Sequence, residues 1–144
     1  MIRRATSGDG EFVRLVTEAA YEGYVDAIGK RPAPMDADFD ADVAAGQVWL
    51  FHDRRGAITM FADGDDWHVA SVAVDPAAQG RGLGRQLMAH AEVVAAERGH
   101  ERITLYTHIA MAGPAALYPR LGYVETGRHR VDGFDRIYFV KRLR

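Results

Sequence analysis

Two spacings of apolar residues alternate along this sequence, and together they predict the order of its secondary-structure elements. Apolar residues alternate or run uninterrupted where a strand is expected, and recur every third and fourth position where a helix is expected. The predicted strands are Ile2–Ala5, Gln47–His52, Ala57–Ala62, Trp67–Val74, Arg102–His108, Tyr123–Arg130 and Phe134–Leu143. The predicted helices are one that runs from about Phe12 towards Ile28, a short acidic one at Asp36–Ala45, one that begins near Leu83 and ends before Gly99, and one at Gly113–Leu121.

The first helix is expected to bury a single apolar face. Its apolar residues recur at spacings of three and four and therefore share one side of a helix. They are Phe12, Leu15, Val16, Ala19 and Ala20. The segment that follows, Gly29–Met35, holds two prolines and two cations and is expected to be irregular.

A glycine-rich loop joins the most apolar predicted strand to the most regular predicted helix. Gly80, Gly82 and Gly84 alternate with Arg81, Leu83 and Arg85 in this loop. Glycines allow the backbone to approach a bulky ligand, and the unpaired N–H groups at a helix start attract anions. The arginines add donors that suit phosphate oxygens. This combination predicts a polyphosphate or pyrophosphate site, whereas the alternative is a tight turn with solvated arginines.

The glycine spacing differs from the two common nucleotide-binding loops. No Gly-Lys-Ser/Thr sequence closes the stretch, which argues against an ATP or GTP P-loop. The glycines follow G-x-G-x-G rather than G-x-G-x-x-G and lie in the middle of the chain, which disfavours a dinucleotide site.

Composition narrows the class of protein. With 144 residues, 48% of them hydrophobic and 26% charged, we expect one globular domain spanning residues 1–144. A net charge of −2 argues against binding nucleic acid by bulk electrostatics. The absence of cysteine excludes disulfides and thiolate chemistry, and no histidine–carboxylate spacing indicates a metal. No apolar segment is long enough for a signal peptide or a membrane span, so we expect a cytoplasmic protein.

The loop resembles the acetyl-coenzyme A motif of the GCN5-related N-acetyltransferase (GNAT) superfamily, Q/R-x-x-G-x-G/A. It reads Gln79-Gly80-Arg81-Gly82-Leu83-Gly84 and follows Val72-Ala73-Val74-Asp75-Pro76. The order of predicted elements also agrees with this family along essentially the whole chain. The resemblance implies an α/β (α+β) fold with a mixed, mostly antiparallel sheet flanked by helices. Its two parallel neighbours, Trp67–Val74 and Arg102–His108, are expected to splay apart.

The resemblance further implies acetyl-CoA as cosubstrate and no metal. The pantetheine arm is expected to pair with the strand backbone, and the pyrophosphate is expected to bind N–H groups of the glycine loop. A backbone donor on the same strand is also expected to polarise the thioester carbonyl. The cofactor-binding residues that this predicts are Val72, Ala73, Val74, Gln79, Gly80, Arg81, Gly82, Leu83, Gly84 and Arg85.

Tyr118 is the predicted catalytic side chain. It lies in Ala116-Leu117-Tyr118-Pro119-Arg120-Leu121-Gly122-Tyr123, which is similar to the A-L-Y-x-x-L-G-F/Y segment of the family. In many relatives this tyrosine protonates the departing thiolate of coenzyme A. The alternative is a helix tyrosine that packs against the sheet.

The general base and one cofactor contact are not evident from the residues. His108, His68 and a water chain are the candidate bases, because histidine titrates nearest neutrality. The fourth strand offers Ala70 and Ser71 where relatives often carry an acid. Met111 takes the place of an asparagine that bonds the cofactor arm in relatives.

We therefore expect an N-acetyltransferase that acts by direct transfer to a primary amine of a small molecule. Candidate walls of the acceptor site are Tyr21, Tyr24, Met35, Phe134 and Arg136, and the cations Lys30 and Arg31 lie near them in the chain. The alternatives are a different acyl group, a protein N-terminus or lysine as acceptor, and a non-catalytic acyl-CoA-binding module. Exposed strand edges and the habit of the family also make a homodimer an expectation.

Overall fold

A seven-stranded sheet runs through the computed structural model, which describes residues 1–143. Its strand order is β1-β2-β3-β4-β5-β7-β6, and every neighbouring pair is antiparallel except β4–β5. The mixed, mostly antiparallel sheet expected from the sequence is thus confirmed. The strands are β1 (Ile2–Arg4), β2 (Val48–Phe51), β3 (Gly56–Asp63), β4 (Asp66–Val74), β5 (Arg102–His108), β6 (Val124–Val131) and β7 (Phe134–Arg142).

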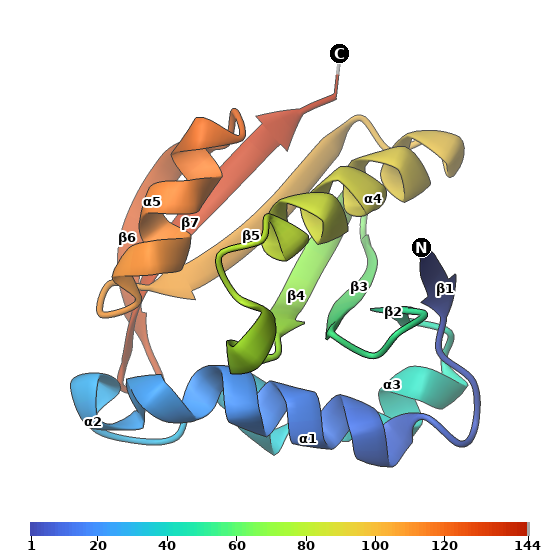
Figure 1. The fold of residues 1–144 in the computed structure, drawn as a ribbon. Coiled ribbons are helices and arrows are strands. Elements are labelled where there is room, and N and C mark those ends of the chain that lie inside the picture. The colour runs from blue at the N-terminus through green and yellow to red at the C-terminus, as the bar shows by residue number, and fades with distance from the viewer. Residues whose placement is uncertain (144) are drawn as a thin grey trace.

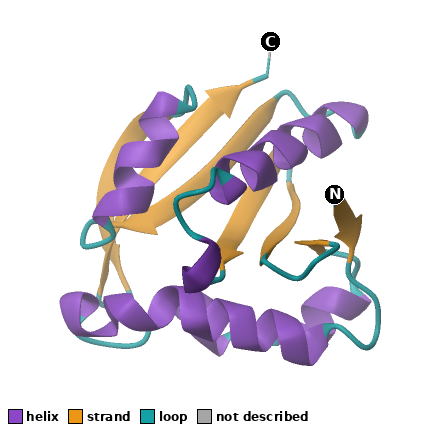
Figure 2. Cartoon of the chain, viewed as in Figure 1, coloured by secondary structure: helices purple, strands orange, loops and turns teal. Residues whose placement is uncertain are grey.

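Helices pack against the sheet on two sides. Figures 1 and 2 show α4 and α5 over one face, and α1, α2 and α3 across one end of the strands. The α-helices are α1 (Gly10–Tyr21), α2 (Val25–Ile28), α3 (Phe39–Ala44), α4 (Leu83–Glu97) and α5 (Ala112–Arg120). Short 3₁₀ turns add η1 (Glu22–Tyr24), η2 (Ala33–Asp36) and η3 (Pro76–Ala78). No helix of the described residues is long and apolar enough to cross a membrane.

The buried side chains form two hydrophobic clusters. The larger contains Trp67, Leu87 and Ile103 and joins α4 to the sheet. The smaller contains Val16 and Leu50 and joins α1 to the strands. Burial of large apolar side chains stabilises by roughly 1.5–3 kcal/mol each, so the two clusters fix the helices against the strands.

The first helix buries a face that only partly matches the predicted one. Val16 is buried as predicted, and Phe12 and Ala20 pack partly buried against the smaller cluster. Val13 and Tyr21 also face the core, whereas Leu15 is 51% exposed. Thr17 is buried on the same side because its hydroxyl donates to the carbonyl of Val13 at 2.7 Å, which satisfies a polar group inside the core. A polar residue therefore occupies a core position, and the apolar pattern alone misplaces the face by one residue.

The helical segments between residues 22 and 45 are also shorter than predicted. The first helix is interrupted by a 3₁₀ turn at residues 22–24 before α2 begins. The acidic helix α3 begins at Phe39 rather than Asp36, because the side chain of Asp38 accepts a hydrogen bond from the N–H of Ala41 and caps it. Residues 33–36 form a 3₁₀ turn, which takes up the end of the segment predicted to be irregular and Asp36, the predicted first residue of the acidic helix.

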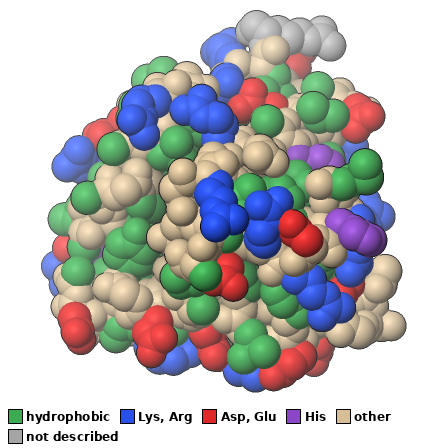
Figure 3. All heavy atoms as spheres, viewed as in Figure 1, with side chains coloured by type: hydrophobic (Ala, Val, Ile, Leu, Met, Phe, Trp, Pro, Cys, Tyr) green, Lys and Arg blue, Asp and Glu red, His purple; other side chains and the backbone are tan. Residues whose placement is uncertain are grey.

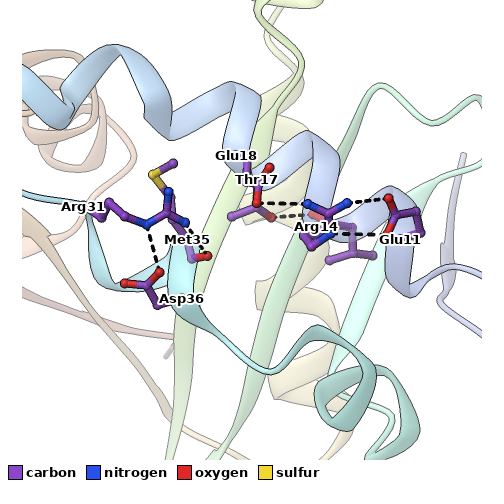
Figure 4. Close-up of polar contacts among 8 residues, drawn as sticks. Glu11, Arg14, Thr17, Glu18, Arg31, Met35 and Asp36 are labelled. Atoms are coloured by element: carbon purple, nitrogen blue, oxygen red, sulfur yellow. Dashed lines mark hydrogen bonds and ion pairs between the residues drawn. The ribbon is translucent and has the colours of Figure 1, made fainter.

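Ion pairs fix the outer surface of α1 and the loop beyond α2. Arg14 lies between Glu11 and Glu18, one turn away on either side (Figure 4). Arg31 pairs with Asp36 at 2.9 Å and donates to the carbonyl of Met35 at 3.3 Å. Arg31 is thereby engaged within its own loop.

The parallel pair β4–β5 separates after three residue pairs. Pairing extends only from Trp67 opposite Ile103 to Val69 opposite Leu105, although both strands continue. On the other edge of β4, Thr59 is opposite Ser71 and Met60 is opposite Val69, so Ala70 is an extra residue in a β-bulge. A bulge bends its strand and increases its twist, which turns the rest of β4 away from β5.

Asp9 anchors the turn from β1 into α1, and we predict that it makes the fold acid-sensitive. Its carboxylate is 3% exposed and accepts hydrogen bonds from Arg3 at 2.9 Å and from the N–H of Thr6 at 2.8 Å. The Arg3 guanidinium, followed by the Thr6 N–H, lowers the pKa of Asp9 well below its usual range. This stabilisation is therefore complete above about pH 4, the unfolded pKa, and is lost as the pH falls through the lower folded pKa.

Asp9→Asn should lower the free energy of unfolding by about 2 kcal/mol at pH 7, because a charged hydrogen-bonding partner of Arg3 is removed. Urea denaturation at pH 7 and at pH 3 measures the effect, and the difference from wild type should narrow at pH 3. Asp53→Asn, which removes an exposed partner of Arg55, is the control and should change stability little. Equal stabilities of Asp9→Asn and wild type at pH 7 would contradict this role.

Candidate active site

A cavity of about 620 Å³ opens where β4 and β5 separate. Its walls come from α1, η2, the separated halves of β4 and β5, the start of α4, α5 and the beginning of β7. Of the eleven site residues predicted from the sequence, nine line it: Val72, Val74, Gln79, Gly80, Gly82, Leu83, Gly84, Arg85 and Tyr118. Ala73 and Arg81 do not.

The glycine loop presents a row of free backbone donors to this cavity. Gly80 and Gly82 have φ values of +83° and +75°, a conformation that residues with a Cβ rarely adopt. The N–H groups of residues 80 to 85 donate to no acceptor within the described part of the chain. Basic side chains gather near the centre of the face in Figure 3, over the start of α4. Free N–H groups and the positive end of a helix together suit an anion of several oxygens.

The edge of β4 that β5 leaves offers backbone carbonyls. The carbonyl of Val72 accepts a hydrogen bond from the hydroxyl of Tyr21 at 3.2 Å, and that of Val74 accepts one from the amide of Gln79 at 3.3 Å. Alternate residues of a strand direct their polar backbone groups to the same edge. Ala73 therefore points its backbone groups the other way, towards β3, and its methyl group is buried in the smaller cluster. Ala73 lies outside the cavity for this reason.

Tyr118 lies on α5 with its ring packed in the core and its hydroxyl free. The ring meets Tyr123 and Phe139 at centroid distances of 6.0 and 5.7 Å. No described residue forms a hydrogen bond with the hydroxyl, although Tyr118 lines the cavity. Burial, reinforced by the hydroxyls of Tyr21 and Tyr24, raises the pKa of Tyr118 well above that of a free phenol. The side chain is thus a neutral hydrogen-bond donor across the physiological pH range.

His108 lines the cavity, but its imidazole is engaged by the backbone. The N–H of Ala110 lies 3.0 Å from Nδ1, and the N–H of Asp135 lies 3.2 Å from Nε2. A neutral imidazole has one free lone pair, so these two donors already exceed what the ring can accept. Desolvation lowers the pKa of His108 and outweighs the opposing effect of the Asp135 carboxylate. His108 therefore has no lone pair to spare for an incoming amine.

His68 lies outside the cavity, among aromatic rings. Its Nδ1 is 2.9 Å from the hydroxyl of Thr104, and its ring stacks on Tyr106 and lies beside Phe61. Desolvation lowers its pKa. Neither histidine is placed as a base at the opening of the two strands.

The predicted acceptor walls are largely present. Tyr21, Tyr24, Phe134 and Arg136 line the cavity, whereas Met35 is buried in the smaller cluster. Met111 also lines it, with its sulfur 3.8 Å from the hydroxyl of Thr107.

Sequence reasoning missed Tyr106 and Arg120 as lining residues. Tyr106 could have been found, because strand alternation puts it on the same face as His108. Arg120 gives no such signal, since its position beside the cavity depends on how α5 packs.

The formally charged side chains that line the cavity are positive. The lining side chains include Arg85, Arg120 and Arg136 and no aspartate or glutamate. Among residues 1–143, no group of three or more histidines, cysteines or carboxylates could hold a metal ion. The arrangement can bind anions and donate protons or hydrogen bonds.

The sequence also matches a family model. Residues 12–123 match the model described as "Acetyltransferase (GNAT) family". The chain belongs to the GNAT acetyltransferase family. The match includes β4, the glycine loop, α4 and Tyr118, so it covers most of the cavity wall.

Relatives of the chain also carry the name of acetyltransferases. The chain is 34% identical over 92 residues to a mycothiol acetyltransferase of Beutenbergia cavernae, a match that covers 60% of this chain and 31% of that protein. The segments matched in these relatives are thus less than a third of the relatives' own length.

Solved structures of N-acetyltransferases share the fold over nearly their full length. PaiA N-acetyltransferase from Thermoplasma acidophilum, in complex with coenzyme A, superposes with a TM-score of 0.80 at 16% identity and covers 99% of this chain and 98% of that one. The ribosomal-protein-S18-alanine N-acetyltransferase of Escherichia coli gives a TM-score of 0.76 at 19% identity, with 99% and 93% covered.

We predict that His108 titrates below its ordinary pKa of 6.5, because two backbone donors and burial disfavour the imidazolium. A lowered folded pKa means that its contribution to stability is present above pH 6.5 and is lost as the pH falls. Nitrogen-detected NMR titration measures the midpoint, and the spectrum of His108→Gln assigns the signal. A midpoint above 6.5 would contradict the two-donor arrangement.

Proposed function

We propose that the chain is an acetyl-CoA-dependent N-acetyltransferase that moves the acetyl group directly onto a primary amine of a small molecule. One observation carries the proposal: the free edge of β4 is followed by six unpaired N–H groups, those of residues 80 to 85, in the glycine loop and the first residues of α4. An extended arm that ends in a pyrophosphate matches this sequence of donors and acceptors. Family membership and the similar fold that binds coenzyme A support the same ligand.

In this proposal the pyrophosphate of acetyl-CoA binds the N–H groups of Gly80 to Arg85, and Arg85 and Arg120 add charge. The pantetheine arm lies along β4 and bonds the backbone of Val72 and Val74. Tyr21 and Gln79 already donate to these carbonyls, and each oxygen has a second lone pair for the arm. Arg81 serves through its backbone N–H, since its side chain lies outside the cavity.

The reaction then proceeds by direct attack. The neutral amine nitrogen attacks the thioester carbonyl carbon, the C–N bond forms, and the C–S bond breaks. Tyr118 donates its proton to the departing sulfur, and the proton released from nitrogen returns to the phenolate through water. The burial that raises the pKa of Tyr118 also destabilises a thiolate beside it, so the transfer is not strongly uphill.

Water is the proposed acceptor of the amine proton. His108 is engaged by two backbone N–H groups, His68 lies outside the cavity, and no described carboxylate lines it. The enzyme therefore selects the small neutral fraction of the amine. The rate at limiting amine should rise with pH up to the pKa of the amine itself.

Tyr118→Phe tests the proposed acid. We expect kcat to fall about 100-fold, because a positioned general acid contributes roughly 10²–10⁴ in rate, while the Kd for acetyl-CoA changes less than about twofold. Thiol release with an amine panel gives kcat, and calorimetry gives the affinity. The control is Tyr123→Phe, which removes the hydroxyl of the neighbouring ring outside the cavity and should retain wild-type turnover. Equal turnover of the two variants would remove Tyr118 from the mechanism.

A further inference from the structure

Arg136 is a cation in the cavity without a counterion. It lies on β7, opposite His108 of β5, and its guanidinium carbon is 4.2 Å from the centre of the Tyr106 ring. The side chain is partly buried, and no described carboxylate pairs with it. Two other arginines of the same hairpin differ, since Arg128 pairs with Glu125 at 3.1 Å and Arg130 with Asp135 at 3.5 Å.

The position of Arg136 separates it from the proposed coenzyme site. Arg85 and Arg120 belong to α4 and α5, whereas Arg136 and Tyr106 belong to the β7–β5 wall. Tyr106 directly follows Leu105, the last β5 residue paired with β4. The guanidinium therefore lies beside the gap between β4 and β5. The proposed function places the thioester in this gap.

The chemistry of a partly desolvated arginine favours a carboxylate partner. Its planar fork of N–H groups matches two carboxylate oxygens, and the ring beneath it limits its freedom. A second cation lies at the same end: the ammonium of Lys30 is 3.9 Å from the centre of the Phe134 ring and donates to the carbonyl of Asp132. Figure 1 shows α2, which precedes Lys30, beside the turn between β6 and β7.

We propose that Arg136 binds a carboxylate of the acceptor, so that the substrate class is amines that also carry a carboxylate, such as amino acids. This deepens the proposed function and rests on it. The proposal excludes polyamines as acceptors. Their second ammonium would lie near arginines of the same charge, and no described carboxylate lines the cavity to pair with it. Because Arg136 lies close to the opening, the amine and the carboxylate belong to one compact molecule.

The test compares matched acceptors with wild type and Arg136→Gln. One arm holds α-, β- and ω-amino acids, the second their carboxamides, and the third carboxyl-free amines including putrescine and spermidine. Thiol release gives kcat/KM for each, and calorimetry gives the Kd for acetyl-CoA. Arg128→Gln is the control, since it removes an arginine of the same hairpin that is paired outside the cavity.

We expect the best amino acid to exceed its carboxamide at least tenfold in kcat/KM. Arg136→Gln should remove this preference by a 10- to 100-fold loss on the carboxylate arm, mainly in KM, with the carboxamide and the acetyl-CoA affinity unchanged. Arg136→Lys should restore part of the loss.

Three results would overturn the inference while acetyl-CoA binding upholds the coenzyme site. They are preference for carboxamides or polyamines, transfer to none of the three arms, and an Arg136→Gln variant that loses acetyl-CoA affinity and both arms equally. The last would assign Arg136 to the coenzyme. Failure of wild type to bind acetyl-CoA is a separate outcome and would overturn the proposed function itself.

Discussion

The early end of pairing between β4 and β5 is the constraint on which the site depends. Three residue pairs hold the strands together, and the bulge at Ala70 then turns β4 away. The separation leaves backbone carbonyls on one edge of β4 and space for a cavity of about 620 Å³ beside them. Since β4 leads through η3 into α4, the same turn directs the helix start and its unpaired N–H groups at that space.

Electrostatics and desolvation then divide the cavity into regions with different chemistry. At one end, backbone N–H groups and Arg85 and Arg120 favour a polyanion. In the middle, burial keeps the phenol of Tyr118 neutral and able to donate. At the β7 wall, Arg136 stacks on Tyr106 without a carboxylate partner. Under the proposed function these three regions bind the phosphates, the thioester and the acceptor, respectively.

The sequence pattern predicted those features of the structure that depend on residues close together in the chain. The elements and the glycine loop follow from short-range spacing, whereas Tyr118 was predicted from the resemblance of its segment to the GNAT family. Nine of the eleven predicted site residues line one cavity. The bulge is also visible in the sequence. The β4 residues that pack in the larger cluster are Trp67, Val69, Val72 and Val74, so their spacing of two residues is interrupted once by a spacing of three. The engagement of His108 by the N–H of Asp135 could not be predicted, because it depends on the pairing of distant strands. The missing ion-pair partner of Arg136 likewise depends on how distant strands pair, and the burial of Thr17 depends on how α1 packs against the sheet.

Calorimetric titration with acetyl-CoA tests the central claim most directly, with NAD and ATP as competing ligands and Gly82→Glu as the matched variant. The proposed function predicts one site for acetyl-CoA and much weaker binding of NAD and ATP. It also predicts loss of acetyl-CoA binding when a carboxylate is placed at residue 82, which has a φ of +75° and lies within the run of unpaired N–H groups at residues 80 to 85. Folded wild-type protein that binds no acetyl-CoA, or a Gly82→Glu variant that binds it normally, would contradict the proposed coenzyme site.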